Sequence, residues 1–424
     1  MSKKKLTFID LFAGCGGLSE GFLSTEKYEG LAHVEWELPM VETLRNRLIN
    51  HWNHTAESAK KRVIHFDIQK TNELINGNWK DESIEKYASN NHIDIINNGL
   101  KGLIGNQKVD LIIGGPPCQA YSIHGRATDS KSMKDDYRNY LFESFAKTVN
   151  FFKPNIFIFE NVPGILSAKP GGIPVTERIY NAFKKIDYTI YNSDELSKSV
   201  FDCSNFGVPQ NRKRVLIIGV KNNTSYNVKD FYKSINENED KNNKQTIRDA
   251  IGFLPKIFPL KKSIKKDKKN ISHYSIDNNV SQHIPRYNNN RDISIFKEWV
   301  ENNMNYISHK DKIEFYYKKT GRNTLYSKYR NLEWDKQSYT IVAHLYKDGL
   351  MFIHPDPEQS RSITIREAAL LMSFPIDYKF IGSNAYCYKM IGNAVPVKFA
   401  KVIGESIYNT ILKIKIKNEC INCL

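Results

Sequence analysis

The stretch VDLIIGGPPCQA, residues 109–120, guides the interpretation of the first half of the chain. Its apolar run, 109–113, predicts a buried strand, and the two glycines that follow predict a turn. Pro116 and Pro117 stiffen this turn, because each proline fixes its own φ and favours extended backbone in the residue before it. The turn therefore presents Cys118 at the carboxyl end of a strand. A thiol there can act as a nucleophile, although an isolated cysteine is more often a small buried side chain.

Similar apolar runs recur through the first half of the chain and predict strands at 6–12, 30–35, 62–67, 109–113, 155–160 and 214–220. Amphipathic segments between several of them predict helices at 40–48, 137–152 and 175–186, and a terminal helix is predicted at 395–414. Continuous apolar strands that alternate with helices are typical of an α/β fold, with a doubly wound, mostly parallel sheet covered on both faces. Residues 70–108 exceed what one connection needs and predict a surface insertion.

The amino-acid composition changes after Val220, where Asn and Lys become frequent. The run KKSIKKDKKN, residues 261–270, predicts a solvated, partly disordered loop as readily as a set of phosphate contacts. Residues 284–348 interleave aromatic with basic side chains, which suits a surface that meets phosphates and bases.

Charge and cysteine content limit the class of protein. The 424 residues carry a formal net charge of +16, which favours a polyanionic partner, although a generally basic protein is an equal alternative. The 6 cysteines are scattered, which favours a reducing cytoplasm. Cys420 and Cys423 supply only two of the four ligands that structural zinc needs, so no metal site is predicted. No leader pattern and no membrane-spanning apolar stretch is recognised, and a cytoplasmic protein is expected.

Three predicted strand ends carry side chains that suit a nucleoside cofactor. The first strand leads into a glycine-rich turn, residues 13–17, that permits close approach of a ligand to the backbone. The second ends in Glu35, a candidate acceptor for ribose hydroxyls, and Trp36, whose indole can stack on adenine. The third is followed by Asp67, whose carboxylate can accept an amino group. Each acid on its own is equally explained by ordinary surface placement.

Two further segments suit a site around Cys118. The predicted strand 155–160 delivers Glu160 at its end. Arg212 and Arg214 alternate in sequence, so on extended backbone they share a face. A thiol, a carboxylic acid and two arginines form a plausible site for an electron-poor ring.

Six motifs, in order along nearly the whole chain, resemble those of the cytosine-C5 DNA methyltransferases of bacterial restriction–modification systems. They are DLFAGCGGLSEGF at 10–22, GGPPCQAYS at 114–122, ENVPG at 160–164, QNRKR at 210–214, RSITIREAALLMSFP at 361–375 and GNAVP at 392–396. Ala394 stands where the family often has serine, which a backbone contact would tolerate.

The resemblance implies a class I, Rossmann-like methyltransferase fold in three parts: a catalytic and cofactor-binding domain at 1–220, a smaller target-recognition domain at 221–360, and a return to the first domain at 361–424. It implies that Cys118 attacks C6 of a cytosine flipped out of double-stranded DNA, that Glu160 binds N3 and the amine, and that Arg212 and Arg214 support the thiolate and the base carbonyl. S-adenosylmethionine would be bound by Phe12, Gly14, Gly16, Glu35, Trp36, Asp67, Ile68, Pro117, Leu141, Asn393 and Val395. A monomer paired in function with a restriction endonuclease is expected.

Chemistry supports this interpretation and leaves three alternatives. Cytosine C6 is a poor electrophile, so the reaction needs a thiolate, which nearby arginines favour, and a carboxyl group with a raised pKa at N3. Methyltransferases that act on exocyclic amines place an aromatic residue after the Pro-Pro pair, whereas this chain has Cys118. An enzyme with the same fold that acts on RNA stays open. The set of Cys118, Glu160, Arg212 and Arg214 argues against an inert DNA-binding protein.

Overall fold

The computed structural model describes residues 4–117, 141–266, 268–277 and 279–422. Contacts divide the chain into two compact units. The first comprises Met1–Phe206, Lys213–Asp240 and Val395–Leu424, and the second comprises Gly207–Arg212 and Lys241–Ala394. The predicted boundaries at 220 and 360 differ from this division.

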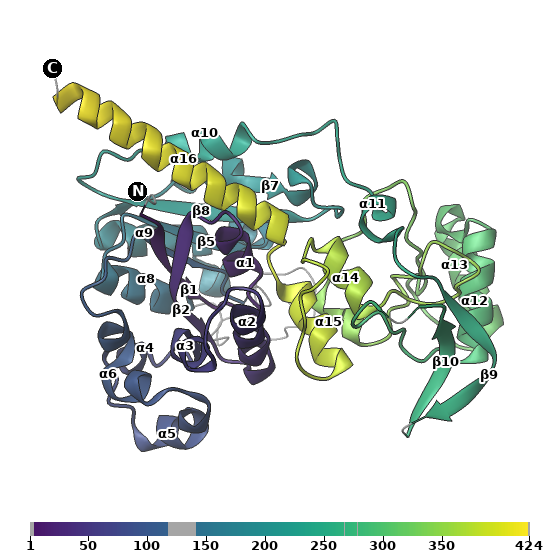
Figure 1. Cartoon of the computed structure of the whole chain (residues 1–424). Coiled ribbons are helices and arrows are strands. Elements are labelled where there is room, and N and C mark those ends of the chain that lie inside the picture. The colour runs from purple at the N-terminus through teal and green to yellow at the C-terminus, as the bar shows by residue number, and fades with distance from the viewer. Residues whose placement is uncertain (1–3, 118–140, 267, 278, 423–424) are drawn as a thin grey trace. The chain divides into compact units, whose positions relative to one another are not determined.

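An eight-stranded mixed sheet forms the centre of the first unit (Figure 1). In spatial order its strands are β3 (Val63–His65), β2 (Tyr28–Glu35), β1 (Leu6–Leu11), β4 (Leu111–Gly114), β5 (Ile156–Asn161), β8 (Lys213–Lys221) and β6 (Tyr188–Thr189), with β7 (Val200–Asp202) also paired to β8. Pairs from β3 to β5 are parallel, and β8 runs antiparallel to its three partners. The predicted α/β class with a mostly parallel sheet is confirmed, and each of the six predicted strands is present.

Helices cover both faces of this sheet. The first unit contains α1 (Gly17–Leu23), α2 (Leu38–Asn50), α3 (Ala56–Arg62), α8 (Leu141–Phe152), α9 (Val175–Lys185), α10 (Val228–Asn236) and α16 (Val397–Asn422). The strand register places Phe8 and Ile156 in one row across β4, so the neighbouring Phe157 points to the opposite face. Phe8 packs on Phe22 of α1, whereas Phe157 packs on Phe145 of α8. The sheet is therefore buried on both sides, which explains why its strands are continuously apolar.

The predicted surface insertion at 70–108 is helical. It contains α4 (Thr71–Asn76), α5 (Asp81–Tyr87) and α6 (Ile93–Ile104). Its buried Trp79 stacks on Phe66 with ring centroids 4.2 Å apart, so the insertion is attached to the sheet by its own apolar packing.

The predicted helices are present, with different ends. The segment predicted at 137–152 is helical from Leu141, and its first four residues lie outside the described ones. The terminal helix α16 extends to Asn422, beyond the predicted end at 414. Among the residues that the structure describes, no helix is long and apolar enough to cross a membrane.

The second unit has a small core of its own. Its helices are α11 (Ile247–Ile251), α12 (Asn290–Glu301), α13 (His309–Thr320), α14 (Ile365–Leu371) and α15 (Asn384–Asn393). Phe296 and Trp299 of α12 are buried with Tyr329 and Ile353. Helix α14 packs on α11, and its Arg366 donates to the carbonyl of Ser281, which explains why residues after 360 group with this unit.

A β-hairpin includes residues 261–270, where the lysine run predicted a partly disordered loop as readily as a set of phosphate contacts. Strands β9 (Ile257–Lys266) and β10 (Lys269–Ser275) are antiparallel, and pairs such as Phe258 with Tyr274 hold the base of the hairpin. Disorder was therefore the wrong expectation for the described part of this run, because apolar residues on either side of the lysines pair across the strands. Lysines at 261, 262, 265, 268 and 269 are exposed.

Candidate active site

The order of the strands identifies where a ligand binds. The chain proceeds outward from β1 through β2 to β3 on one side, and from β4 to β5 on the other. In open α/β sheets, ligands bind outside the carboxyl ends of the strands at such a switch point. Here the switch lies between β1 and β4, so the loops after these two strands frame the candidate site.

The loop after β1 adopts unusual backbone geometry. Phe12 is half-buried and has a φ of 60°, which non-glycine residues rarely adopt, and Gly14 has a φ of 57°. A Cβ added to Gly14 would meet no heavy atom within 4 Å, so there is open space above this backbone. Gly16, with a φ of 88°, is the N-cap residue of α1. The loop can therefore accept a ligand close to its main chain.

Glu35, the last residue of β2, holds this loop in place. One carboxylate oxygen accepts the N–H of Gly14 at 2.8 Å, and the other accepts the N–H groups of Trp36 and Glu37 at 2.8 and 2.9 Å. Burial raises the pKa of Glu35 to about 7, although these N–H groups favour the charged form. A carboxylate has about four lone-pair sites, so one stays available for a ligand hydroxyl.

The neighbouring strand ends complete the set of residues predicted for a cofactor in the first unit. The indole of Trp36 is 47% exposed, and Asp67 follows β3, where its carboxylate accepts the N–H of Gln69. Ile68 and Leu141, the first residue of α8, are buried. Open space over glycine, a carboxylate acceptor and an exposed aromatic ring fit a nucleoside. Of the other predicted residues, Val395 lies in the first unit and Asn393, at the end of α15, in the second.

Glu160 and Arg214 form a buried ion pair. Glu160 lies on β5 and Arg214 on the antiparallel neighbour β8, and the Arg214 Nε lies 2.7 Å from the Glu160 Oε1. Their side chains are each only 10% exposed. The structure brings these two residues of the predicted site together, and the arginine fixes the direction of the carboxylate.

The loop after β4 packs against this pair. A Cβ on Gly115 would lie 2.7 Å from the Glu160 Oε2, so only glycine allows the carboxylate to approach this closely. Asn161 donates to the carbonyl of Pro116 at 3.3 Å and so ties the loop to β5. Pro117 is half-buried, and Cys118, the next residue, lies outside the described residues.

Arg212 has a different environment from Arg214. It belongs to the second unit, is buried, and donates to the carbonyl oxygens of Ile341, Gly392 and Ala394 at 2.8, 3.0 and 3.0 Å. The expected shared face with Arg214 presupposed a single strand. Strand β8 begins at Lys213, so Arg212 precedes it.

The site also contains residues that the sequence motifs alone do not single out. Asn161 lies in the motif ENVPG and Gly115 in the motif GGPPCQAYS, close to residues that were predicted for the site. Their position in these motifs was the only sequence signal for their role. Asp10 is buried and accepts a hydrogen bond from Ser19 at 2.5 Å, and burial raises its pKa to about 7. Ser19 in turn contacts His33, and burial lowers the pKa of this histidine to about 3. No pattern in the local sequence predicts the contacts between Asp10, Ser19 and His33.

Comparisons with known proteins agree with this geometry. The family model described as C-5 cytosine-specific DNA methylase matches residues 66–409. A type II methyltransferase of Bacillus paralicheniformis, M.Bpa9945I, is 34% identical over 95% of this chain and 98% of its own length. The type II methyltransferase M1.HphI of Haemophilus parahaemolyticus is 27% identical over 95% of this chain and 86% of its own.

Solved structures show the same fold. A prophage-encoded protein of E. coli, described as a DNA modification methyltransferase, superposes with a TM-score of 0.60 at 23% identity, over 96% of this chain and 99% of its own. The Dnmt2 methyltransferase of S. pombe has a TM-score of 0.51 at 14% identity, over the same shares of the two chains.

The fold is that of a class I methyltransferase, and the candidate site lies at the switch between β1 and β4. Within that class, the chain belongs to the C-5 cytosine-specific DNA methylase family, and it is a DNA cytosine-5-methyltransferase of the type II restriction–modification kind. The predicted family is confirmed.

Proposed function

We propose that this enzyme transfers a methyl group from S-adenosylmethionine to C5 of a cytosine that is flipped out of a specific duplex DNA sequence. The observation that carries the proposal is the buried ion pair of Glu160 and Arg214 against the Gly115–Pro117 loop, directly before Cys118. In the cell, the modification protects DNA from a cognate restriction endonuclease. The relatives' names as type II methyltransferases support this role.

Cys118 and Glu160 act at different atoms of the cytosine ring. The Cys118 thiolate forms a bond to C6, and the electron pair of the C5–C6 double bond moves toward N3. Glu160 in its protonated form donates a hydrogen bond to N3, which stabilises that charge, and it accepts another from the exocyclic amine. C5, which this addition makes nucleophilic, forms a bond to the methyl group that S-adenosylmethionine would supply. Loss of the C5 proton then returns the C–H electron pair to the ring as Cys118 departs with the C6–S pair, which restores aromaticity.

The two arginines of the predicted site have positioning roles. Arg214 fixes the Glu160 carboxylate through its 2.7 Å contact, so the acceptor is oriented before the base arrives. For Arg212 we propose a positioning role, since its terminal nitrogens donate to backbone carbonyls of the second unit.

The predicted cofactor residues at the ends of β1, β2 and β3 would hold S-adenosylmethionine, which supplies an electrophilic methyl group when it is bound. Glu35 would accept a ribose hydroxyl, Trp36 would stack on the adenine, and Asp67 would accept its amino group. The open backbone at Gly14 supports a close approach of the ligand.

Base flipping costs a few kcal/mol because stacking and pairing are lost. The formal charge of +16 and the exposed lysines of the β9–β10 hairpin supply favourable phosphate contacts that offset this cost.

The proposal is tested in two stages. Bisulfite sequencing of DNA from cells that express the enzyme identifies the modified cytosine and its surrounding sequence. A duplex with 5-fluorocytosine at that position is then incubated with enzyme and S-adenosylmethionine. We expect a covalent complex that survives denaturing electrophoresis, because the C5 substituent cannot leave as a proton.

Cys118→Ser is the matched control, which should bind the same duplex without forming the covalent complex or methylating unmodified DNA. A wild-type enzyme that methylates the site yet is not trapped would contradict the covalent mechanism, as would comparable methylation rates for Cys118→Ser and wild type.

A further inference from the structure

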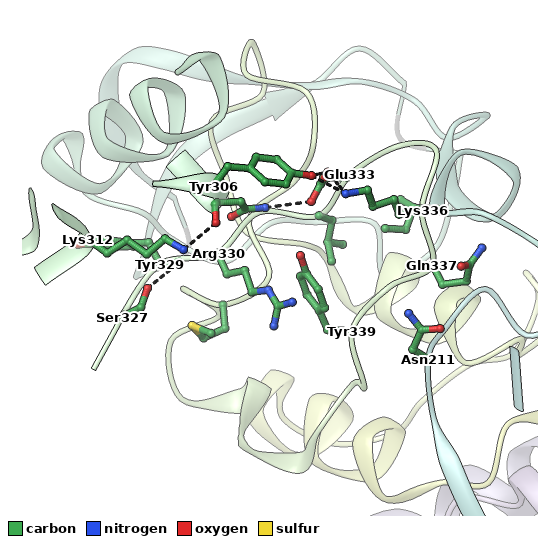
Figure 2. Close-up of a pocket in the computed structure, with 14 residues that line it drawn as sticks. Asn211, Tyr306, Lys312, Ser327, Tyr329, Arg330, Glu333, Lys336, Gln337 and Tyr339 are labelled. Carbon is green, nitrogen blue, oxygen red and sulfur yellow. Dashed lines mark hydrogen bonds and ion pairs between the residues drawn. The ribbon is translucent and has the colours of Figure 1, made fainter. Parts of the chain in front are cut away.

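The second unit contains a pocket of about 520 Å³ that belongs to none of the cofactor or catalytic positions described above (Figure 2). Residues from five separate stretches of the chain line it, among them Asn211, Tyr306, Arg330, Glu333, Lys336 and Tyr339. Aromatic rings, amides and basic side chains therefore converge on one concave surface.

Three charged groups of this pocket have hydrogen-bond or ion-pair partners within the second unit. Lys336 lies 2.8 Å from a carboxylate oxygen of Glu333, and both contact the hydroxyl of Tyr306. Lys312 donates to the carbonyl of Asn305 at 2.6 Å. These groups shape the wall of the pocket.

Arg330 differs from these groups. Its guanidinium lies over the ring of Tyr339, as Figure 2 shows, and the side chain is exposed. Among the described residues, no hydrogen-bond acceptor or carboxylate partner of this guanidinium is found. Its planar set of donors therefore faces the pocket ready for an external acceptor.

The backbone on both sides of this stack is fixed. Arg330 donates its N–H to the carbonyl of Leu350 at 3.0 Å and accepts the N–H of Ile353 at 3.1 Å. Next to Tyr339, Ser338 donates its N–H to Pro209 and accepts the N–H of Asn211, both at 2.9 Å. The arginine is thus oriented before a ligand binds, which reduces the entropy lost on binding.

We propose that Arg330, held over Tyr339, donates to a guanine of the target sequence in the major groove, and that this pocket is a specificity-determining site of the enzyme. The inference rests on the proposed function, because it takes duplex DNA as the ligand. Arginine paired with O6 and N7 of guanine is the commonest base-specific contact, and the fixed plane of the stack suits that two-point geometry.

A neighbouring side chain favours a base edge over a phosphate. The pocket also carries the amide of Asn211, and side-chain amides pair with base edges through a donor and an acceptor together.

The test measures sequence preference without the covalent step. Proteins that carry Cys118→Ser bind a library of duplexes randomised around the target cytosine, and the bound fraction is sequenced. Arg330→Lys keeps the charge and loses the planar fork. We expect the preference for guanine at one position to fall roughly 5- to 150-fold, with the other positions unchanged.

Arg322→Lys is the matched control, because Arg322 is exposed in the same unit and does not line the pocket. It should leave every position unchanged. Tyr339→Phe should keep the preference because the ring remains, whereas Tyr339→Ala should weaken it at the position that Arg330→Lys affects.

An unchanged preference in Arg330→Lys would overturn the inference. A uniform loss of affinity for all sequences with a smaller salt dependence would also overturn it, since that is the signature of a phosphate contact. If the Cys118→Ser reference itself enriches no sequence, the proposed sequence-specific function fails together with the inference, and this result is distinct from the other two.

Discussion

Gly115→Ala tests whether the loop after β4 and Glu160 form one rigid site. The added methyl group would lie 2.7 Å from the Glu160 Oε2, whereas ordinary contacts begin at 3.4 Å. The carboxylate must therefore retreat by about 0.7 Å, the difference between these two distances. It cannot do so freely, because Arg214 holds the other oxygen at 2.7 Å and both side chains are buried.

This displacement should lower both the stability of the enzyme and its rate of methyl transfer. Overpacking of a well-packed site costs about 1–3 kcal/mol of stability. A misplacement of about 1 Å in a reacting group costs about 100-fold in rate, so a retreat of this size should lower kcat/KM roughly 10- to 100-fold. Duplex binding should change little, because the substitution neither adds nor removes a charge.

The assay compares kcat/KM for methyl transfer to the cognate duplex with the midpoint of thermal unfolding. Gly404→Ala in α16 is the matched control, since its Cβ would meet Thr25 at an ordinary 3.4 Å. That substitution should leave activity unchanged and stabilise the helix by about 0.5–1 kcal/mol. A Gly115→Ala enzyme with wild-type kcat/KM would refute the claim that Gly115 confines the Glu160 carboxylate.

Two other predictions concern charge. Because burial raises the pKa of Glu35 to about 7, its contribution to stability is present below about pH 4.5 and is lost as the pH rises to 7, whereas buried His33 acts in the opposite sense. The free energy of unfolding of Glu35→Gln, measured with denaturant, should therefore rise by about 3 kcal/mol relative to that of wild type as the pH increases from 4.5 to 7. A difference in unfolding free energy that stays constant over this pH range would contradict the prediction. The second prediction replaces Lys261, Lys262 and Lys265 with Gln. The slope of log affinity for DNA against log salt concentration should become shallower by about 0.9 for each phosphate that the hairpin no longer neutralises, and the enzyme should still methylate the same sites. An unchanged slope would show that the hairpin does not bind DNA.

The sheet could be predicted from sequence because burial on both faces leaves a local signal. Strands such as β4 and β5 are apolar at nearly every position, and their ends coincide with glycine, proline or acidic residues. The end of α16 could not be predicted in the same way. Residues 412–419 are half-buried or exposed, so the apolar periodicity stops while the helix continues to Asn422.

The site was predictable only as far as its residues follow strand ends. Glu160 was placed correctly at the end of β5, but its 2.7 Å contact with Arg214 depends on the antiparallel pairing of β5 with β8. The Arg330 pocket is harder still, since it joins residues between Asn211 and Met351 through pairings that leave no mark on the local sequence.

The motif QNRKR shows why alternation alone was insufficient. Its residues through Arg212 group with the second unit, and Lys213 and Arg214 group with the first. Gln210 accepts the N–H of Ile341 and donates to the carbonyl of Leu371, and Arg212 binds three further carbonyls, so this half of the motif stabilises backbone. Arg214 instead orients the carboxylate of Glu160. Two arginines two positions apart therefore meet different requirements. Removal of Arg212 would leave buried carbonyls unsatisfied, and removal of Arg214 would leave a buried carboxylate without its counter-ion.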